Sequence, residues 1–141
     1  MTDGAGLPLA AYVHAGQASD LEPVPALLDG IAIPGRVGAP RRYPAALAGD
    51  KSYSYAPVRQ WCRRHRVTAV LPRRRDQRPV KGRRFDRVRY RQRHVIEATV
   101  GHLKEFRRIA QRADKLALRY RAFVLLGMVR LILRRPFLNT A

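Results

Sequence analysis

The stretch Tyr-Arg-Gln-Arg-His-Val-Ile-Glu, residues 90–97, and its continuation to Lys104 form the most informative part of this chain. At the helical rotation of about 100° per residue, four polar side chains of the segment fall within an arc of about 60°. This stripe consists of Tyr90, Arg93, Glu97 and Lys104. The apolar side chains fall on the far side: Val95, Leu103, Phe106 and Ile109. The spacing therefore predicts a helix with one buried face and one polar stripe.

The polar stripe places a single carboxylate, Glu97, among cations. Such a carboxylate can ligate a metal or act as a general base, with the surrounding cations binding phosphate. A solvated helix whose charges form ion pairs four residues apart would show the same spacing and is the more common case. The spacing by itself leaves both interpretations open.

Asp50 is the second candidate acid. Residues 43–48 read as a short buried strand that ends at Gly49-Asp50, and ligands of open α/β sheets gather outside the carboxyl ends of strands. A turn-forming aspartate is the alternative, because Asp favours strand ends. Together, Asp50 and Glu97 suggest a two-metal nuclease-type site with Mg²⁺ held by hard carboxylate oxygens. Such a site normally needs at least three carboxylates.

Outward from these acids, the pattern predicts an α/β chain. Strands are expected at 7–13, 43–48 and 67–71, and a loop at 73–84. Helices are expected from about 18 to 28, at 59–66, from about 86 to 112, and from about 114 to 134, with Pro136 ending the last one. Residues 122–129 are apolar on all sides of that helix, which predicts that they are buried.

Composition narrows the class of protein. The 141 residues carry a net charge of +19, and 46% are hydrophobic, which excludes a disordered basic tail. The charge indicates a polyanionic partner, either nucleic acid or an anionic membrane surface, rather than an ordinary metabolic enzyme. With a lone Cys62, no signal peptide and no long apolar run, we expect a cytoplasmic or nucleoid-associated protein without a membrane segment.

The first 35 residues contain no Lys or Arg, so the positive charge lies almost entirely beyond Gly35. Its densest part is the loop at 73–84, for which we favour contact with the DNA phosphate backbone over a merely solvated loop. The predicted DNA-contacting residues outside the stripe are Lys51, Arg73, Arg74, Arg75 and Lys81. A zinc-protease helix is excluded, because His94 and His102 are eight residues apart instead of four.

The spacing Tyr-x2-Arg-x3-Glu-x6-Lys, present here at Tyr90, Arg93, Glu97 and Lys104, resembles the DDE transposases of bacterial insertion sequences. Other stretches resemble the same family: residues 4–9 its hairpin, 14–20 a turn, 48–53 its strand end, and 106–117 its stretch after the glutamate. The resemblance extends from about Gly4 to Arg134.

This resemblance implies a ribonuclease-H-like fold with an Asp-Asp-Glu triad that binds two Mg²⁺ ions. Asp50 would be the second acid and Glu97 the third, both as catalytic metal ligands. Tyr90, Arg93 and Lys104 would assist by contacting DNA or the scissile phosphate. The implied reaction is hydrolysis at transposon ends, followed by attack of the freed 3′-hydroxyl on target DNA.

The chain also departs from the family. No residue matches the family's first acid, and Ser52 replaces the usual glycine after Asp-Lys. We also expect that an N-terminal DNA-binding region is absent. We therefore expect residues 1–141 to be a partial catalytic domain, truncated at the N-terminus. It would comprise a sheet region with Asp50 (7–72), a basic loop (73–85) and C-terminal helices with Glu97 (86–135).

A truncated domain would arise from a decayed element or from the second reading frame of a two-frame element. We expect such a chain to be inactive alone, and to act with a homo-oligomer partner or with the product of an upstream frame. The alternative is a non-enzymatic basic DNA-binding protein derived from a decayed transposase. A ribosomal-type protein is a weaker alternative, because it would have no use for the Tyr90–Lys104 stripe.

Overall fold

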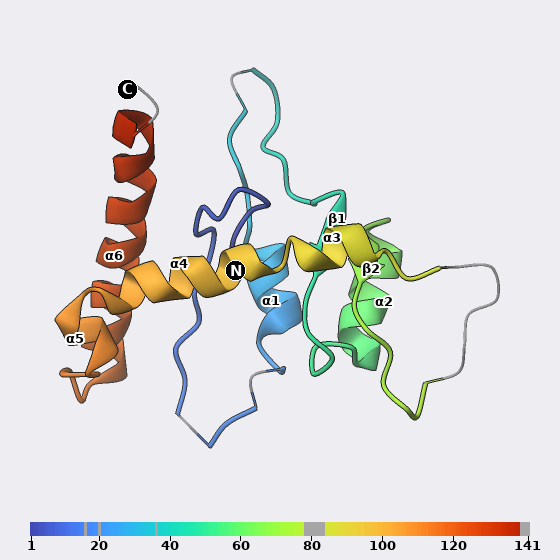
Figure 1. Ribbon diagram of the computed structural model, residues 1–141, viewed down its shortest axis with the longest axis horizontal. Helices are drawn as coiled ribbons and strands as arrows, with labels where there is room; N and C mark the ends of the chain where they lie inside the picture. The colour runs from blue at the N-terminus through green and yellow to red at the C-terminus, as the bar shows by residue number, and fades with distance from the viewer. Residues whose placement is uncertain (16, 20, 36, 78–83, 139–141) are drawn as a thin grey trace. The chain divides into compact units, whose positions relative to one another are not determined.

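The computed structural model describes residues 1–15, 17–19, 21–35, 37–77 and 84–138, without the side chains of 135–138 (Figure 1). The chain divides into two compact units. The contiguous unit is Ser19–Arg93, and the discontinuous unit combines Met1–Ala18 with His94–Ala141. The boundary between Arg93 and His94 falls inside the range 86–135, and each unit is described below by itself.

The contiguous unit has mixed α/β structure. Its elements are α1 (Val24–Asp29), β1 (Ala46–Ala48), α2 (Ala56–Arg64), β2 (Thr68–Val70) and α3 (Arg87–Arg91). The two strands pair in parallel, with Ala46 opposite Thr68 and Ala48 opposite Val70, and α2 is the crossover between them. This small parallel sheet agrees with the α/β class that the sequence predicts, and the strands at 43–48 and 67–71 are confirmed in shortened form.

Local sequence explains why α2 forms and what it buries. Pro57 lies in its first turn, where a proline is tolerated, and the helix begins after the extended residue Tyr55. Apolar side chains recur at Val58, Trp61 and Cys62, so that one face of the helix is buried. The buried apolar residues of the unit are Val24, Leu28, Val58, Trp61, Cys62, Val67, Val70 and Leu71. Trp61 and Cys62 therefore both belong to the core of this unit.

The discontinuous unit contains α4 (His94–Lys104), α5 (Arg107–Ala110) and α6 (Ala117–Leu138). In Figure 1, α5 lies at the bend between α4 and α6. Ile109, Val124 and Met128 form the buried cluster, against which Leu103 and Phe106 pack. The contacts of α6 with α4 and α5 need a small residue, because a Cβ atom at Gly127 would lie 3.0 Å from side-chain atoms of Leu103 and Ile109.

The strand expected at 7–13 is not formed, so this prediction was wrong. In the described part of the N-terminal segment the only strand-like pairing is an isolated bridge between Thr2 and Pro8. The segment is held by other bonds, since Leu9 N–H donates to Met1 O at 3.0 Å and the Thr99 hydroxyl donates to Gly6 O at 2.7 Å. A strand needs a partner for its backbone groups, and this segment satisfies them in turns and on α4 instead.

The single helix expected over 86–112 is also wrong, because it is broken twice. Arg93 N–H donates to Tyr90 O in a tight turn that separates α3 from α4. Phe106 has extended backbone angles and separates α4 from α5. In a straight helix Leu103 and Ile109 would point about 120° apart. The second break allows both residues to pack on the α6 cluster.

The last helix differs from expectation in two respects. It continues through Pro136 to Leu138, so the expectation that Pro136 ends it was wrong. The φ angle of proline suits a helix, and the hydrogen bond that it removes lies close to the helix end. Residues 122–129 are not buried on all sides. Val124, Gly127 and Met128 are buried, whereas Leu126 is 63% exposed and Val129 is 50% exposed. One face of α6 therefore packs inside the unit while another is open.

Candidate functional site

Asp50 lies two residues beyond β1, at the carboxyl end of the parallel sheet. Its Oδ1 atom accepts hydrogen bonds from the backbone N–H of Ser52 at 2.8 Å and from the Ser52 hydroxyl at 2.5 Å. The next turn of chain is closed by Ser54 N–H, which donates to Lys51 O at 3.2 Å. The sequence thus places this carboxylate in a hydrogen-bonded turn at the end of a strand.

Hydrogen bonding keeps Asp50 ionised. The Ser52 hydroxyl is the largest influence and lowers the pKa of the Asp50 carboxyl, against an opposing contribution from burial. The backbone N–H groups of Ser52 and Tyr53 and the positive charge of Arg93 lower this pKa further. An ionised, partly exposed carboxylate with hard oxygen donors fits the ligand chemistry of Mg²⁺.

Ser52 is accommodated in the turn where the resembled family has glycine. Among the described non-glycine residues, positive φ angles occur at Arg66 and Arg112 and nowhere else. The turn after Asp50 therefore does not require the left-handed backbone conformation that favours glycine. The serine also contributes a hydroxyl donor to Asp50 that a glycine could not supply.

Sequence reasoning missed a polar network next to this turn. The Ser54 side chain is fully buried, and its hydroxyl donates to Gln77 Oε1 at 3.0 Å. The Arg59 guanidinium donates to the same hydroxyl oxygen from Nε at 3.0 Å and from Nη2 at 2.7 Å, and to Leu71 O at 3.0 Å. Serine, arginine and glutamine in these positions form no motif, so no signal in the sequence indicates the network.

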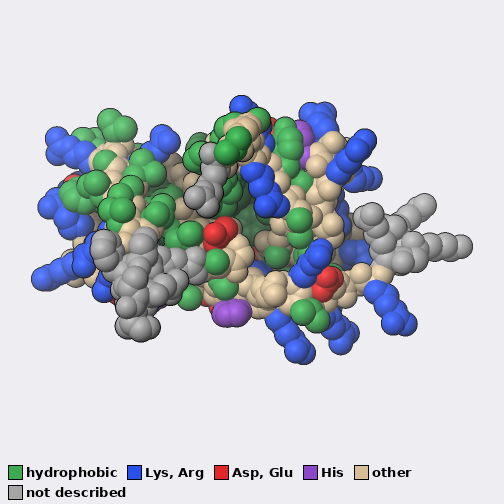
Figure 2. Space-filling model, turned by 90° about the horizontal axis from the view of Figure 1, so that it is seen from above, with side chains coloured by type: hydrophobic (Ala, Val, Ile, Leu, Met, Phe, Trp, Pro, Cys, Tyr) green, Lys and Arg blue, Asp and Glu red, His purple; other side chains and the backbone are tan. Residues whose placement is uncertain are grey.

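The predicted DNA-contacting arginines follow β2 at the same edge of the sheet, because parallel strands end on the same side. Arg73, Arg74 and Arg75 are exposed, and Arg74 Nε lies 3.7 Å from Asp76 Oδ1. Lys51 is exposed in the turn after Asp50, and Lys81 lies outside the described residues. Figure 2 shows many Lys and Arg side chains projecting into solvent on the face that it displays.

Tyr90 and Arg93 lie in and just after α3, within the contiguous unit. Asp86 begins this helix by accepting a hydrogen bond from Arg89 N–H at 2.9 Å. The Arg93 guanidinium lies over the Tyr90 ring, 5.6 Å from its centroid, which keeps the two side chains together. Through its charge, Arg93 is also linked electrostatically to Asp50.

Glu97 and Lys104 lie on α4, in the discontinuous unit. Both side chains are exposed, and their separation of seven residues puts them on one face of the helix. The single helical stripe expected for all four residues is therefore not formed, because the chain turns at Gln92 and Arg93. The structure groups Asp50, Tyr90 and Arg93 in one unit, and Glu97 and Lys104 in the other.

Within the described ranges, no three His, Cys, Asp or Glu side chains are grouped so that they could hold a metal ion. His102, which the sequence excludes from a zinc site, instead pairs with Glu105 through its Nδ1 atom at 2.8 Å. The Oδ1 atom of Asp50, one of the two acids expected to bind Mg²⁺, accepts its hydrogen bonds from Ser52. Its fit to Mg²⁺ thus rests on ligand chemistry and ionisation.

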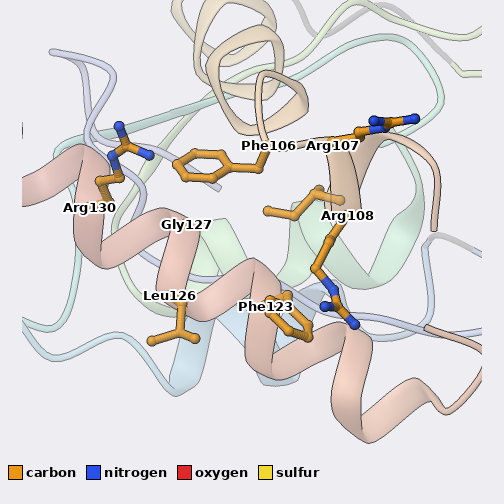
Figure 3. A pocket seen from close by; sticks show the side chains of 8 residues that line it. Phe106, Arg107, Arg108, Phe123, Leu126, Gly127 and Arg130 are labelled. Atoms are coloured by element: carbon orange, nitrogen blue, oxygen red, sulfur yellow. The ribbon is translucent and has the colours of Figure 1, made fainter. Parts of the chain in front are cut away.

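A separate pocket of about 360 Å³ lies in the discontinuous unit (Figure 3). Arg130 stacks beside Phe106 with 5.0 Å to the ring centroid, and Arg108 beside Phe123 with 4.5 Å. The remaining lining residues are Arg107, Ile109, Leu126 and Gly127. The lining contains no residue that the sequence predicts to bind metal or DNA, so this pocket is not the candidate site.

The apolar length of the helices and the comparisons with known proteins bear on the class of protein. No helix in the part of the chain that the structure describes is both long and apolar enough to span a bilayer. No curated protein and no solved structure matches the chain. The family model of the transposase DDE domain, in contrast, matches residues 1–132, which include all the candidate site residues. That family has a ribonuclease-H-like fold, a role in transposition and DNA as its partner. The chain therefore belongs to the transposase DDE domain family.

Proposed function

We propose that this chain acts in DNA transposition by binding DNA along its basic surface and by contributing Asp50 and Glu97 to a two-metal catalytic site. The observation that supports this most directly is the shared sheet edge. Asp50 follows β1, and the exposed arginines at 73–75 follow β2 at the same end of a parallel sheet. A metal-ligating carboxylate and phosphate-binding cations are the groups that phosphodiester chemistry requires side by side.

Asp50 and Glu97 would hold the metal in this proposal. When bound, two Mg²⁺ ions supply Lewis-acid stabilisation to the attacking and the leaving oxygen atoms of the scissile phosphate. The chain's own part is to keep the Asp50 carboxylate ionised through Ser52 and to orient DNA through Arg93, Tyr90 and Lys104. The signature spacing of the last three with Glu97 supports the further proposal that the chain belongs to the insertion-sequence group of bacterial transposases.

The proposal extends to partners and location. Because two carboxylates hold two metal ions poorly, a further acid would come from a second copy of the chain or from another polypeptide. With DNA as its partner, the chain would work at the nucleoid.

Mn²⁺ titration followed by NMR tests the metal site without requiring turnover. Mn²⁺ replaces Mg²⁺ at oxygen-ligand sites and broadens the resonances of nearby amides. We expect broadening at residues 48–53 and 94–100. Glu97→Gln should weaken it, whereas Glu105→Gln, the same change at a nearby exposed glutamate, should not. Equal effects of the two substitutions would contradict Glu97 as a ligand.

The alternative is a non-enzymatic DNA-binding protein, for which the net charge of +19 provides the support. Incubation with Mg²⁺ and transposon-end DNA distinguishes the two. The proposed function expects strand transfer only when a chain supplying the further acid is added, and expects Glu97→Gln to abolish it while DNA binding is kept. Persistent strand transfer in Glu97→Gln would contradict the catalytic proposal, and DNA binding without any Mn²⁺ broadening would support the alternative.

A further inference from the structure

The buried hydroxyl of Ser54 joins two segments that follow different strands. Ser54 ends the turn that begins at Asp50, since its N–H donates to Lys51 O at 3.2 Å. On its other side, its hydroxyl donates to Oε1 of Gln77, which lies 23 residues further along the chain. The link therefore connects the Asp50 turn after β1 with the arginine segment after β2.

Gln77 uses both ends of its amide in this link. Nε2 donates to the backbone carbonyl of Ser54, while Oε1 accepts from the Ser54 hydroxyl and from Arg74 N–H at 3.3 Å. The Gln77 N–H in turn donates to Arg74 O at 3.2 Å. The backbone of Arg74 is thus held from both its N–H and its C=O by one residue.

Arg59 closes the network from the side of α2. Its guanidinium donates to the Ser54 hydroxyl and to Leu71 O, the carbonyl immediately after β2. Together these bonds connect the end of the Asp50 turn at Ser54, the end of β2 at Leu71 and the arginine segment at Arg74. A network that served only the core would not need to reach the backbone of an exposed cationic segment.

We propose that Gln77 is a positioning residue that fixes the backbone of Arg73–Arg75 beside the Asp50 turn. In this arrangement the same stretch of DNA backbone contacts both the arginines and the carboxylate. This inference rests on the proposed function, because it concerns the same DNA-binding edge. It adds a residue that touches neither metal nor DNA and that no motif indicates.

The isosteric substitution Gln77→Met removes the amide and keeps the volume, and Gln60→Met on the exposed face of α2 is its matched control. DNA affinity is measured with a labelled duplex over a range of salt concentrations. Each lost phosphate contact lowers the slope of log K against log salt by about 0.9. We expect Gln77→Met to lower the slope by about 1 to 2 and to weaken binding several-fold, and Gln60→Met to change neither.

A double-mutant cycle separates positioning from a merely structural role. If Gln77 acts through the arginines, Gln77→Met should have almost no further effect on affinity in a chain that already carries Arg73→Ala, Arg74→Ala and Arg75→Ala. An equal fold-change in both backgrounds would overturn the positioning role. A wild-type chain that fails to bind DNA would contradict the proposed function instead, so the two failures are distinguishable.

Hydrogen exchange on the wild-type chain gives a reading that does not depend on whether a variant folds. The Arg74 N–H donates a hydrogen bond to Gln77 Oε1, so its hydrogen should exchange more slowly than that of the Arg75 N–H. Exchange at Arg74 should slow further when DNA is bound. Exchange of Arg74 at the rate of an unstructured peptide, in the free and the DNA-bound chain alike, would also overturn the proposal.

Discussion

Removing the three arginines after β2 should change the salt dependence of DNA binding by a predictable amount. Arg73, Arg74 and Arg75 are exposed, and each can release a condensed counterion by neutralising one phosphate. The Arg74–Asp76 pair at 3.7 Å is exposed on both sides, so it competes weakly with phosphate, and we count Arg74 in full. The perturbation is the triple substitution to alanine.

The magnitude follows from the counterion relation. Three lost phosphate contacts should lower the slope of log K against log salt by about 2.7. Over a fourfold salt range, from about 50 to 200 mM, the wild type should therefore lose about 40-fold more affinity than the variant. The variant should also bind more weakly at low salt, where the electrostatic contribution is largest.

The assay is fluorescence anisotropy of a labelled duplex at several salt concentrations. The control carries Lys115→Ala, Arg119→Ala and Arg121→Ala, three exposed cations of the discontinuous unit, so that both variants lower the net charge from +19 to +16. A slope that changes equally in both variants would show that only total charge matters. It would refute the assignment of the phosphate contacts to the sheet edge.

Three further predictions concern the packing and ionisation described above. Ser52→Ala should raise the pKa of Asp50, because the Ser52 hydroxyl is the main influence that lowers it. The stabilisation that depends on this lowered pKa is present above the unfolded value of about 3.9 and is lost as pH falls through the folded value, so the variant should lose less stability on acidification. An NMR titration that finds an unchanged Asp50 pKa would contradict this. Gly101→Ala should stabilise α4 by about 0.5–1 kcal/mol, because a Cβ there meets open space. Gly127→Ala should not give this stabilisation, because its Cβ would crowd the side chains of Leu103 and Ile109. Urea unfolding curves that show equal stabilisation by the two substitutions would argue against the close packing of α6. Cys62 is 1% exposed and burial raises the pKa of its thiol, so it should react with a thiol reagent only after unfolding. Rapid labelling of the native chain would be inconsistent with its place in the core.

The elements that could be predicted from sequence are those with strong local signals. Pro57 followed by the apolar positions of Val58, Trp61 and Cys62 indicates α2, and the apolar run at 67–71 indicates β2. The breaks at Arg93 and Phe106 carry neither glycine nor proline, so nothing local predicts them. The break at Phe106 is decided by packing, since Ile109 can reach Val124 and Met128 only if the chain turns after α4.

The candidate site likewise contains residues that could be predicted from the sequence and residues that could not. Asp50 and the arginines after Pro72 could be predicted because strand ends and charge density are visible in the sequence. Gln77 and Ser54 could not, because their meeting depends on two strands pairing in parallel across an intervening helix. Whether a buried polar residue finds its partner is a property of the fold, and spacing along the chain does not report it.

The discontinuous unit is built from two separate segments of the chain, so it cannot fold completely until the second segment has been synthesised. Gly6 receives its hydrogen bond from Thr99, a residue 93 positions later, so the first segment cannot be docked until α4 has been made. At ordinary translation rates that interval is on the order of 5–20 s. The contiguous unit, Ser19–Arg93, is synthesised entirely within this interval and is complete shortly before Thr99 is added, so it can begin to fold at the ribosome before the first segment docks. The segment at 1–18, with the apolar residues at 7–13, therefore stays undocked during that interval, which is when a chaperone would act on it.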